Sequence, residues 1–155
     1  IWPSDWKVKI VDILKSEGYK PDRYWMYKEA RICQIWPVWN YSFPNAKWII
    51  VRRRTGDIIE SCLKTGYMNA YNDKDGWLDW VHHHEALFVE MIKSGLNCKI
   101  VWPERMASDD FTQMIEMVEW LGLKWNDKIE DLIKPLLQNS KQKNKGGING
   151  KSNCD

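Results

Sequence analysis

The sequence lacks a long hydrophobic run, a large excess of either charge, and closely spaced cysteines. No apolar stretch approaches the ~18 residues of a membrane-spanning helix, and the opening IWPSDW has no secretory-signal pattern. The 23 basic and 21 acidic side chains leave a net charge of +2, which provides no general attraction to nucleic acid or membranes. We therefore expect a cytoplasmic protein with no nucleic-acid partner and no membrane partner.

The four cysteines are spread along the chain without a C-x-x-C pair, at Cys33, Cys62, Cys98 and Cys154. This spacing argues against a zinc knuckle or a redox dithiol, and four cysteines are too few for a disulfide scaffold of this length. We expect reduced thiols and no metal site. The chain begins with Ile1 and not with Met, which indicates a processed or truncated start.

The composition is otherwise that of a globular protein, with 44% hydrophobic and 28% charged residues, and it includes 11 tryptophans. Bulky aromatic side chains bury much area per residue, so most are expected in the core or in pocket walls. One compositional boundary divides the chain. Residues 1–138 combine apolar periodicity with turn signals, whereas residues 139–155 have almost no apolar content. We predict one domain over 1–138 and a flexible polar tail over 139–155.

Apolar periodicity predicts both helices and strands. Helices are expected between Ser4 and Gly18, over 57–68, over 75–94, from Ser108 to Gly122 and over 126–137. Strands are expected at 47–51 and 98–102, with further extended segments at 24–27 and 32–35 and a loop between Pro37 and Pro44. Helices that alternate with short buried strands indicate an α/β fold with a mainly parallel sheet flanked by helices.

The most informative stretch is 47–68, KWIIVRRRTGDIIESCLKTGYM. A buried strand ends in three arginines, turns at Gly56 and enters a helix that carries Ser61. Ligands of open α/β sheets bind beyond the carboxyl ends of the strands, and a helix N-terminus there offers free N–H groups and positive charge. Arginine adds a planar fork suited to phosphate or sulfate. The pattern predicts an oxyanion-binding cradle; the alternative is a solvated strand end without a ligand.

The same stretch resembles the sulfotransferase family. Residues 43–51 read FPNAKWIIV and are followed by Arg53, Asp57 and Ser61, which is similar to the family pattern FP-x-A-K-(apolar strand)-R-x-x-x-D-x-x-x-S. In that family the Arg and the Ser hold the 3′-phosphate of 3′-phosphoadenosine 5′-phosphosulfate (PAPS). The resemblance therefore implies that Arg53 and Ser61 bind PAPS or its product PAP. The chain departs from the family at 55–56, where Thr-Gly replaces the usual Pro-Arg.

Two further segments are similar to the family in the same order. Residues 25–31, WMYKEAR, look like its W-x-x-K-x-P-R, and residues 100–106, IVWPERM, look like its V-x-Y-E-x-L. The resemblance covers about 25–137, looks closest to the divergent phage and bacterial members, and implies a P-loop NTPase-like sulfotransferase fold. It also suggests that Lys28, expected at a strand end, neutralises the charge that develops on the leaving phosphate. An ordinary surface lysine is the alternative.

The family's Ser/Gly/Thr-rich loop for the 5′-phosphosulfate has no counterpart before Lys47, where Gly18 is the only glycine. The chain therefore looks like the C-terminal part of a sulfotransferase domain, incomplete at its N-terminus, and it would be an enzyme only if the loop were supplied. The implied reaction passes a sulfuryl group from PAPS to a hydroxyl or amine of a small-molecule or glycan acceptor. The alternatives are a non-catalytic binding or structural module, such as a virion component, and a nucleotide or sugar kinase-like protein.

Two other features have open interpretations. His82, His83 and His84 are consecutive, so on a helix they point about 100° apart and cannot share one metal ion. Helical spacing places His84 on the apolar face, either as a hydrogen-bonded core residue or as a general base. The aromatic segment 36–41, WPVWNY, would either stack an adenine or a sugar or pack as the lid of a loop.

Overall fold

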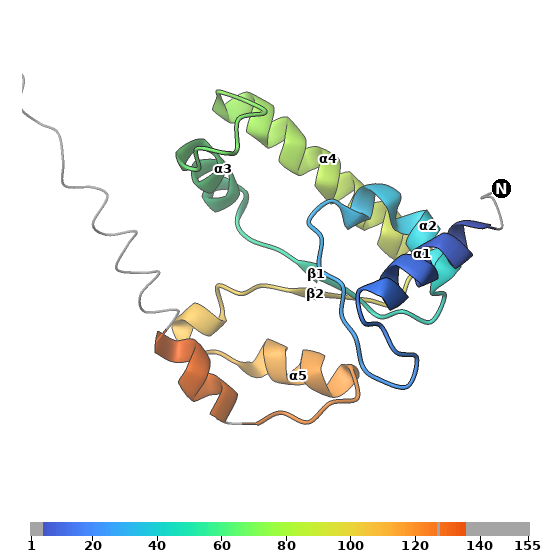
Figure 1. Cartoon of the computed structure of the whole chain (residues 1–155). Helices are drawn as coiled ribbons and strands as arrows, with labels where there is room; N and C mark the ends of the chain where they lie inside the picture. The colour runs from blue at the N-terminus through green and yellow to red at the C-terminus, as the bar shows by residue number, and fades with distance from the viewer. Residues whose placement is uncertain (1–4, 127, 136–155) are drawn as a thin grey trace, which may run out of the picture. The chain divides into compact units, whose positions relative to one another are not determined.

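The computed structural model of the chain describes residues 5–126 and 128–135 (Figure 1). In chain order, the elements are α1 (Asp5–Ser16), η1 (Ile32–Ile35), α2 (Trp36–Ser42), β1 (Trp48–Val51), α3 (Thr55–Lys64), α4 (Lys74–Lys93), β2 (Cys98–Val101), η2 (Met106–Ser108) and α5 (Thr112–Trp120). Residues 128–135 are also helical. The α/β class that the sequence predicts is confirmed.

β1 and β2 form a two-stranded parallel sheet. The N–H of Trp48 donates to the carbonyl oxygen of Asn97, and the N–H of Arg52 donates to that of Val101, both at 2.8 Å. The partners advance by the same number of residues along both strands, which is the register of a parallel pair. α3 and α4 lie between the two strands in the chain, as a parallel connection requires. Within the described residues the sheet has no third strand, so it is smaller than the sequence led us to expect.

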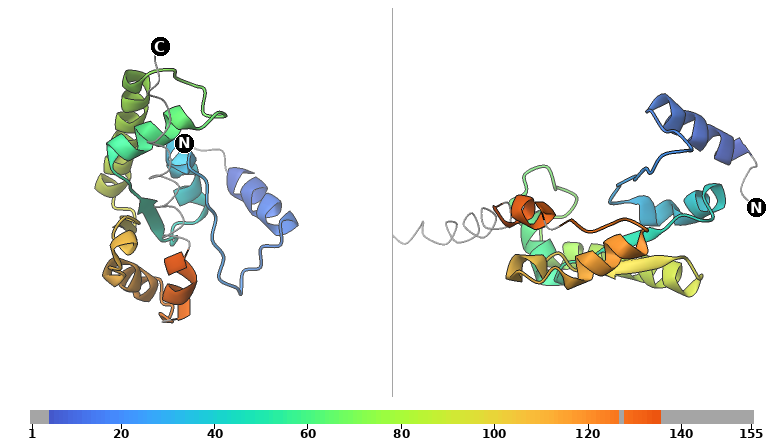
Figure 2. Two further views of the ribbon diagram at one scale, coloured as in Figure 1. Left: turned by 90° about the vertical axis from the view of Figure 1, so that its left-hand side faces the viewer. Right: turned by 90° about the horizontal axis from the view of Figure 1, so that it is seen from below.

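The chain divides into two compact units, the first formed by Ile1–Ile50 with Arg54–Cys98 and the second by Val51–Arg53 with Lys99–Asp155. In the first unit α1 packs against α2, α3 against α4 and η1 against α4 (Figure 2). In the second unit the ring centroid of Phe111 lies 6.2 Å from that of Trp125. Lys134 Nζ lies 5.6 Å from the same Phe111 ring, so helical residues 128–135 pack beside the start of α5.

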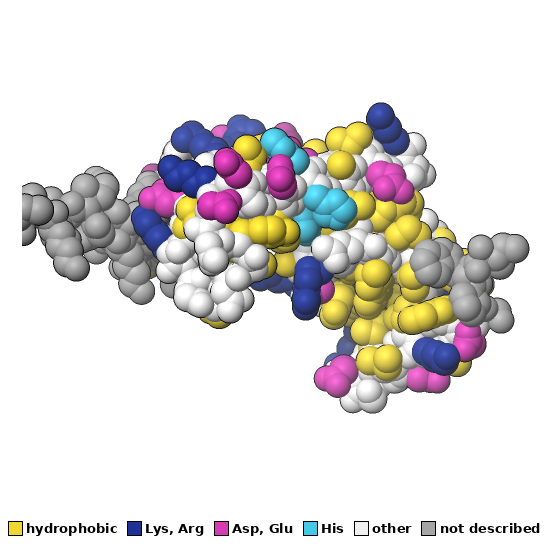
Figure 3. Space-filling model, turned by 90° about the horizontal axis from the view of Figure 1, so that it is seen from above, with side chains coloured by type: hydrophobic (Ala, Val, Ile, Leu, Met, Phe, Trp, Pro, Cys, Tyr) yellow, Lys and Arg dark blue, Asp and Glu magenta, His cyan; other side chains and the backbone are white. Residues whose placement is uncertain are grey.

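α4 forms because its sequence supplies both a start signal and an apolar face. The Asp73 side chain caps the helix by accepting a 2.8 Å hydrogen bond from the N–H of Gly76. Four side chains at helical spacing are buried: Trp77, Val81, His84 and Met91. His82 and His83 are exposed, as the periodicity predicts. Figure 3 shows histidine side chains at the surface near acidic groups.

Three helices end at glycines that the sequence marks as stops. Gly18, Gly95 and Gly122 follow α1, α4 and α5 and have φ angles of 94°, 76° and 83°. After α4 the N–H of Gly95 donates to Ile92 and the N–H of Leu96 donates to Met91. These two bonds define a Schellman motif, which satisfies the last carbonyl groups of the helix. The same pair of bonds follows α1 and α5.

The segment before β1 differs from the prediction. Residues 24–29 have no regular secondary structure, and Ile32–Ile35 forms η1 instead of an extended segment. The expected loop from Pro37 to Pro44 is largely α2. Pro37 occupies the first turn, where its missing N–H is not needed, and Val38 and Ser42 face the core one turn apart. Aromatic and β-branched residues favour a strand only where a partner strand exists, and here none is described.

The remaining differences concern the ends of elements. α3 begins two residues before the predicted start at 57 and ends at Lys64, before 68. Ser108 belongs to η2 and does not cap α5, which starts at Thr112 with the Asp110 side chain accepting a 3.1 Å hydrogen bond from the Thr112 N–H. The predicted tail over 139–155 lies outside the described residues. Across the described ranges, no helix is both long enough and apolar enough to cross a membrane.

Candidate functional site

The arginine run lies between β1 and α3. At the end of β1, Ile50 is buried, Val51 is exposed and Arg52 is half-buried. Arg54 is the N-cap residue of α3 and is extended, with φ −59° and ψ 134°, but its side chain makes no capping hydrogen bond. The first N–H groups of α3 therefore follow the arginines directly. Asp57 lies in the same turn and places a negative charge that complements the helix dipole.

Arg53 and Ser61 are both exposed. Within the described part of the chain, neither side chain makes a hydrogen bond or an ion pair. Arg53 belongs to the second unit, and Ser61 belongs to the first. Ser61 is the seventh residue of α3 and so lies in its second turn. Its carbonyl oxygen accepts a 2.7 Å hydrogen bond from the Thr65 hydroxyl.

Lys28 is exposed and lies in the irregular segment 24–29, not at the end of a strand. The strand end that was expected there is wrong, because Lys28 is followed by a turn and η1. The ammonium group makes no hydrogen bond or ion pair with the described residues.

His84 is buried in the first unit, with 5% of its surface exposed. Its Nδ1 lies 2.8 Å from the carbonyl oxygen of Trp80, and the two rings are 3.9 Å apart. A carbonyl oxygen only accepts, so Nδ1 is the donor in this contact. Nε2 is buried without a partner among the described residues. The position supports the core interpretation of His84 over that of a base that reaches a substrate.

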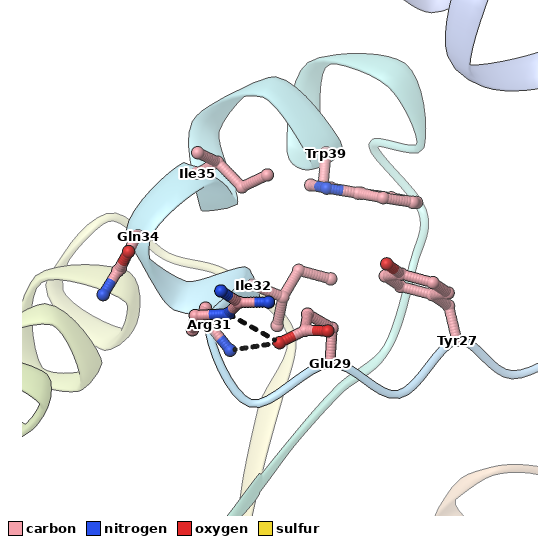
Figure 4. A pocket seen from close by; sticks show the side chains of 7 residues that line it. All are labelled: Tyr27, Glu29, Arg31, Ile32, Gln34, Ile35 and Trp39. Carbon is pink, nitrogen blue, oxygen red and sulfur yellow. Dashed lines mark hydrogen bonds and ion pairs between the residues drawn. The ribbon is translucent and has the colours of Figure 1, made fainter. Parts of the chain in front are cut away.

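A hollow of about 320 Å³ lies in the first unit beside η1 and α2 (Figure 4). Seven residues line it: Tyr27, Glu29, Arg31, Ile32, Gln34, Ile35 and Trp39. Two of them carry opposite charges and bind each other. Glu29 Oε1 accepts a 3.2 Å bond from Arg31 Nε and a 3.1 Å bond from the Arg31 backbone N–H. These bonds lower the pKa of Glu29, so the carboxylate is charged at neutral pH.

An aromatic cluster supports one wall of this hollow. The rings of Tyr27 and Trp39 are stacked, with centroids 4.7 Å apart and an interplanar angle of 15°. Trp39 also stacks on Phe43 at 6.1 Å. Phe43 meets Trp25 edge to face at 5.1 Å, and Trp25 meets Tyr19 at 5.3 Å. The sequence analysis left open whether 36–41 stacks on a ligand or packs as the lid of a loop, and it predicted neither the partner Tyr27 nor the Glu29–Arg31 pair.

Among the described residues no cluster of three or more His, Cys, Asp or Glu side chains could hold a metal ion. Cys33, Cys62 and Cys98 are not joined in disulfide bonds, and Cys154 lies outside the described residues. Burial raises the pKa of Cys33 and of Cys98, which favours the protonated thiol over the thiolate.

Comparison of the chain with protein-family models, with curated proteins and with solved structures finds no match.

Proposed function

We propose that this chain is a sulfotransferase-like domain that binds the 3′-phosphate of PAPS through Arg53 and Ser61. The observation that carries the proposal is the order of elements around 48–64: a strand of a parallel sheet, three arginines, and a helix that starts at once. Nucleotides bind beyond the carboxyl ends of parallel strands. The resemblance of 43–61 to the sulfotransferase pattern then selects the ligand.

The chemistry of the two side chains fits a dianionic phosphate. The guanidinium group of Arg53 is always charged and presents parallel N–H donors that match two phosphate oxygens. The Ser61 hydroxyl adds a neutral donor. Both groups are exposed and make no hydrogen bond with the described residues, so a ligand displaces no bonded partner.

In the complete reaction the acceptor oxygen or nitrogen attacks the sulfur of PAPS in line with the leaving group. The bond between sulfur and the bridging oxygen breaks, PAP leaves with the electron pair, and the acceptor proton passes to a base. In this proposal Arg53 and Ser61 hold PAPS in place, which lowers the entropic cost of the attack. Lys28 remains the proposed counter-charge for the phosphate that departs.

A binding module without catalysis is the second candidate. Residues 5–47 contain α1, η1 and α2 but no strand followed by a phosphate loop. A chain that holds the 3′-phosphate alone would bind PAP without transferring a sulfuryl group.

The test is calorimetric titration of the full chain with PAP and with 5′-AMP, which lacks the 3′-phosphate. PAP is expected to bind about 10- to 100-fold more tightly than AMP, because charge-assisted hydrogen bonds to one phosphate contribute about this much affinity. Arg53→Ala and Ser61→Ala are expected to reduce this preference, and Arg53→Ala is expected to abolish most of it.

Matched controls are Arg23→Ala and Ser94→Ala, which remove exposed side chains of the same types elsewhere in the first unit. Both are expected to keep the preference for PAP. Equal affinity for PAP and AMP in the native chain, or no heat with either, would contradict the 3′-phosphate site. Turnover of PAPS with a nitrophenol acceptor then separates the enzyme from the binding module.

A further inference from the structure

We propose that the hollow lined by Tyr27, Glu29, Arg31 and Trp39 is a binding site for a neutral saccharide. The hollow belongs entirely to the first unit and lies apart in the sequence from the arginine run. Its volume of about 320 Å³ is at the lower end of the range of about 300–1,000 Å³ for small-molecule sites. This size suits one or two sugar rings.

The aromatic wall provides the first half of the recognition. Tyr27 stacks on Trp39, yet 46% of its surface is exposed, so part of the ring is accessible to a ligand. The negative face of an aromatic ring attracts the partially positive C–H groups on one face of a sugar. The contacts of Trp39 with Phe43, and of Phe43 with Trp25, hold this wall in place before a ligand arrives. A preformed wall reduces the ordering cost of binding.

The Glu29–Arg31 ion pair provides the polar part of the recognition. Glu29 uses Oε1 for both of its bonds to Arg31, and no described residue bonds its Oε2. Arg31 uses Nε and its backbone N–H, and its two terminal amino groups make no hydrogen bond within the described ranges. One carboxylate oxygen and several N–H groups thus remain available side by side. Vicinal hydroxyl groups, which both donate and accept, match this combination.

The balance of charge separates a saccharide from other ligands. Because Glu29 and Arg31 neutralise each other, the hollow offers no net charge to a phosphate, a sulfate or an ammonium group. A nucleobase would also stack on Tyr27. However, a saccharide uses the aromatic face and the paired donor and acceptor together, and therefore fits better. Binding of the sugar is independent of the proposed function. Only a role of the sugar as acceptor of the sulfuryl group would rest on that function.

The test is saturation-transfer NMR on the full chain with three neutral probes: maltose, cellobiose and N,N′-diacetylchitobiose. At least one probe is expected to receive saturation at its ring C–H protons. Tyr27→Ala is expected to weaken the binding by about fivefold or more, the effect of losing one aromatic face. Tyr24→Ala is the matched control, because this neighbouring tyrosine is 82% exposed and does not line the hollow. It is expected to bind like the native chain.

Glu29→Gln is a second variant that leaves the aromatic wall unchanged, and about threefold weaker binding is expected from it. The proposal is overturned if the folded native chain transfers no saturation to any of the three sugars. It is also overturned if Tyr24→Ala and Tyr27→Ala lose binding equally, or if adenosine gives a Tyr27-dependent signal and the sugars give none. The PAP titration on the same preparation tests the proposed function separately, since sugar binding without PAP binding would remove only that function.

Discussion

His84 illustrates how a buried polar side chain can act mainly through its packing. Its Nδ1 is satisfied by Trp80, but its Nε2 has no partner among the described residues. A buried polar atom without a hydrogen bond costs about 1–3 kcal/mol. The ring itself contributes favourable packing through its contact with Trp80. The shape of His84 therefore stabilises the first unit more than its polarity does.

This reasoning predicts different outcomes for two substitutions. His84→Phe keeps a ring against Trp80 and removes the unsatisfied nitrogen, so the free energy of unfolding is expected to stay within about 1 kcal/mol of the native value. His84→Ala leaves a cavity and is expected to lower it by about 2–4 kcal/mol. Urea unfolding followed by circular dichroism measures both changes.

His82→Ala serves as the control, because His82 is exposed and its loss is expected to change stability by less than about 0.5 kcal/mol. If His84→Phe proves as destabilising as His84→Ala, the polar atoms of His84 have a bonding role that the core interpretation omits. An unchanged PAP affinity in His84→Phe would further separate this residue from nucleotide binding.

At the level of elements, glycines serve two different purposes. Gly122 follows α5 with φ 83°, a region that other residues enter only at a cost. Gly56 lies within α3 and has no such angle. A Cβ atom added at either position meets no atom within 4 Å. Alanine substitutions at Gly122 and Gly56 therefore test how backbone conformation affects stability, without a steric clash at either position.

Gly122→Ala is expected to lower the free energy of unfolding by about 1 kcal/mol, because alanine is strained in the left-handed region. Gly56→Ala is expected to raise it by about 0.5–1 kcal/mol, because alanine favours the helix and restricts the unfolded chain. Thermal unfolding of the two variants beside the native chain tests the opposite signs. A loss of stability in both would show that Gly56 has a further role at the start of α3.

The helix stops could be predicted because each depends on a single local residue type. The strands at 48–51 and 98–101 were also evident, since their short apolar runs need only one partner. By contrast, 32–35 and 36–42 misled the prediction. The β-branched residues of 32–35 favour a strand, but contacts of η1 with α4 favour a helical turn. Pro37 and Pro44 indicated a loop, but Pro37 lies in the first turn of α2, where a helix tolerates proline.

At the scale of the whole molecule, charge is balanced. The net charge is +2 over 155 residues, and several acidic side chains are engaged locally, as in the pairs Lys9–Asp5, Lys64–Glu60 and Arg105–Asp110. Balanced charges produce little long-range potential at physiological salt.

We therefore predict no appreciable binding to nucleic acid. Fluorescence anisotropy of a labelled DNA duplex at about 0.15 M salt is expected to show no saturation below about 100 µM protein, the weak end of non-specific affinities. Polylysine in the same buffer is the positive control. Tighter binding that weakens steeply with added salt would reveal a local basic surface that the net charge conceals.

The candidate sites were predictable to different degrees. Arg53 and Ser61 emerged from a linear motif, because a strand end and the following helix are close in sequence. The hollow did not, because it combines Tyr27 and the Glu29–Arg31 pair with Trp39, and their meeting depends on η1 and α2. Sequence spacing alone does not show that these side chains come together, because this depends on the conformation of the segment between them.

The run of ring contacts from Tyr19 through Trp25, Phe43 and Trp39 to Tyr27 also has an optical consequence. Chromophores held at fixed mutual angles couple their electronic transitions and acquire near-ultraviolet dichroism, which vanishes when side chains rotate freely. The segment from Tyr19 to Phe43 therefore contains an intrinsic spectroscopic reporter of its own order, readable without any label.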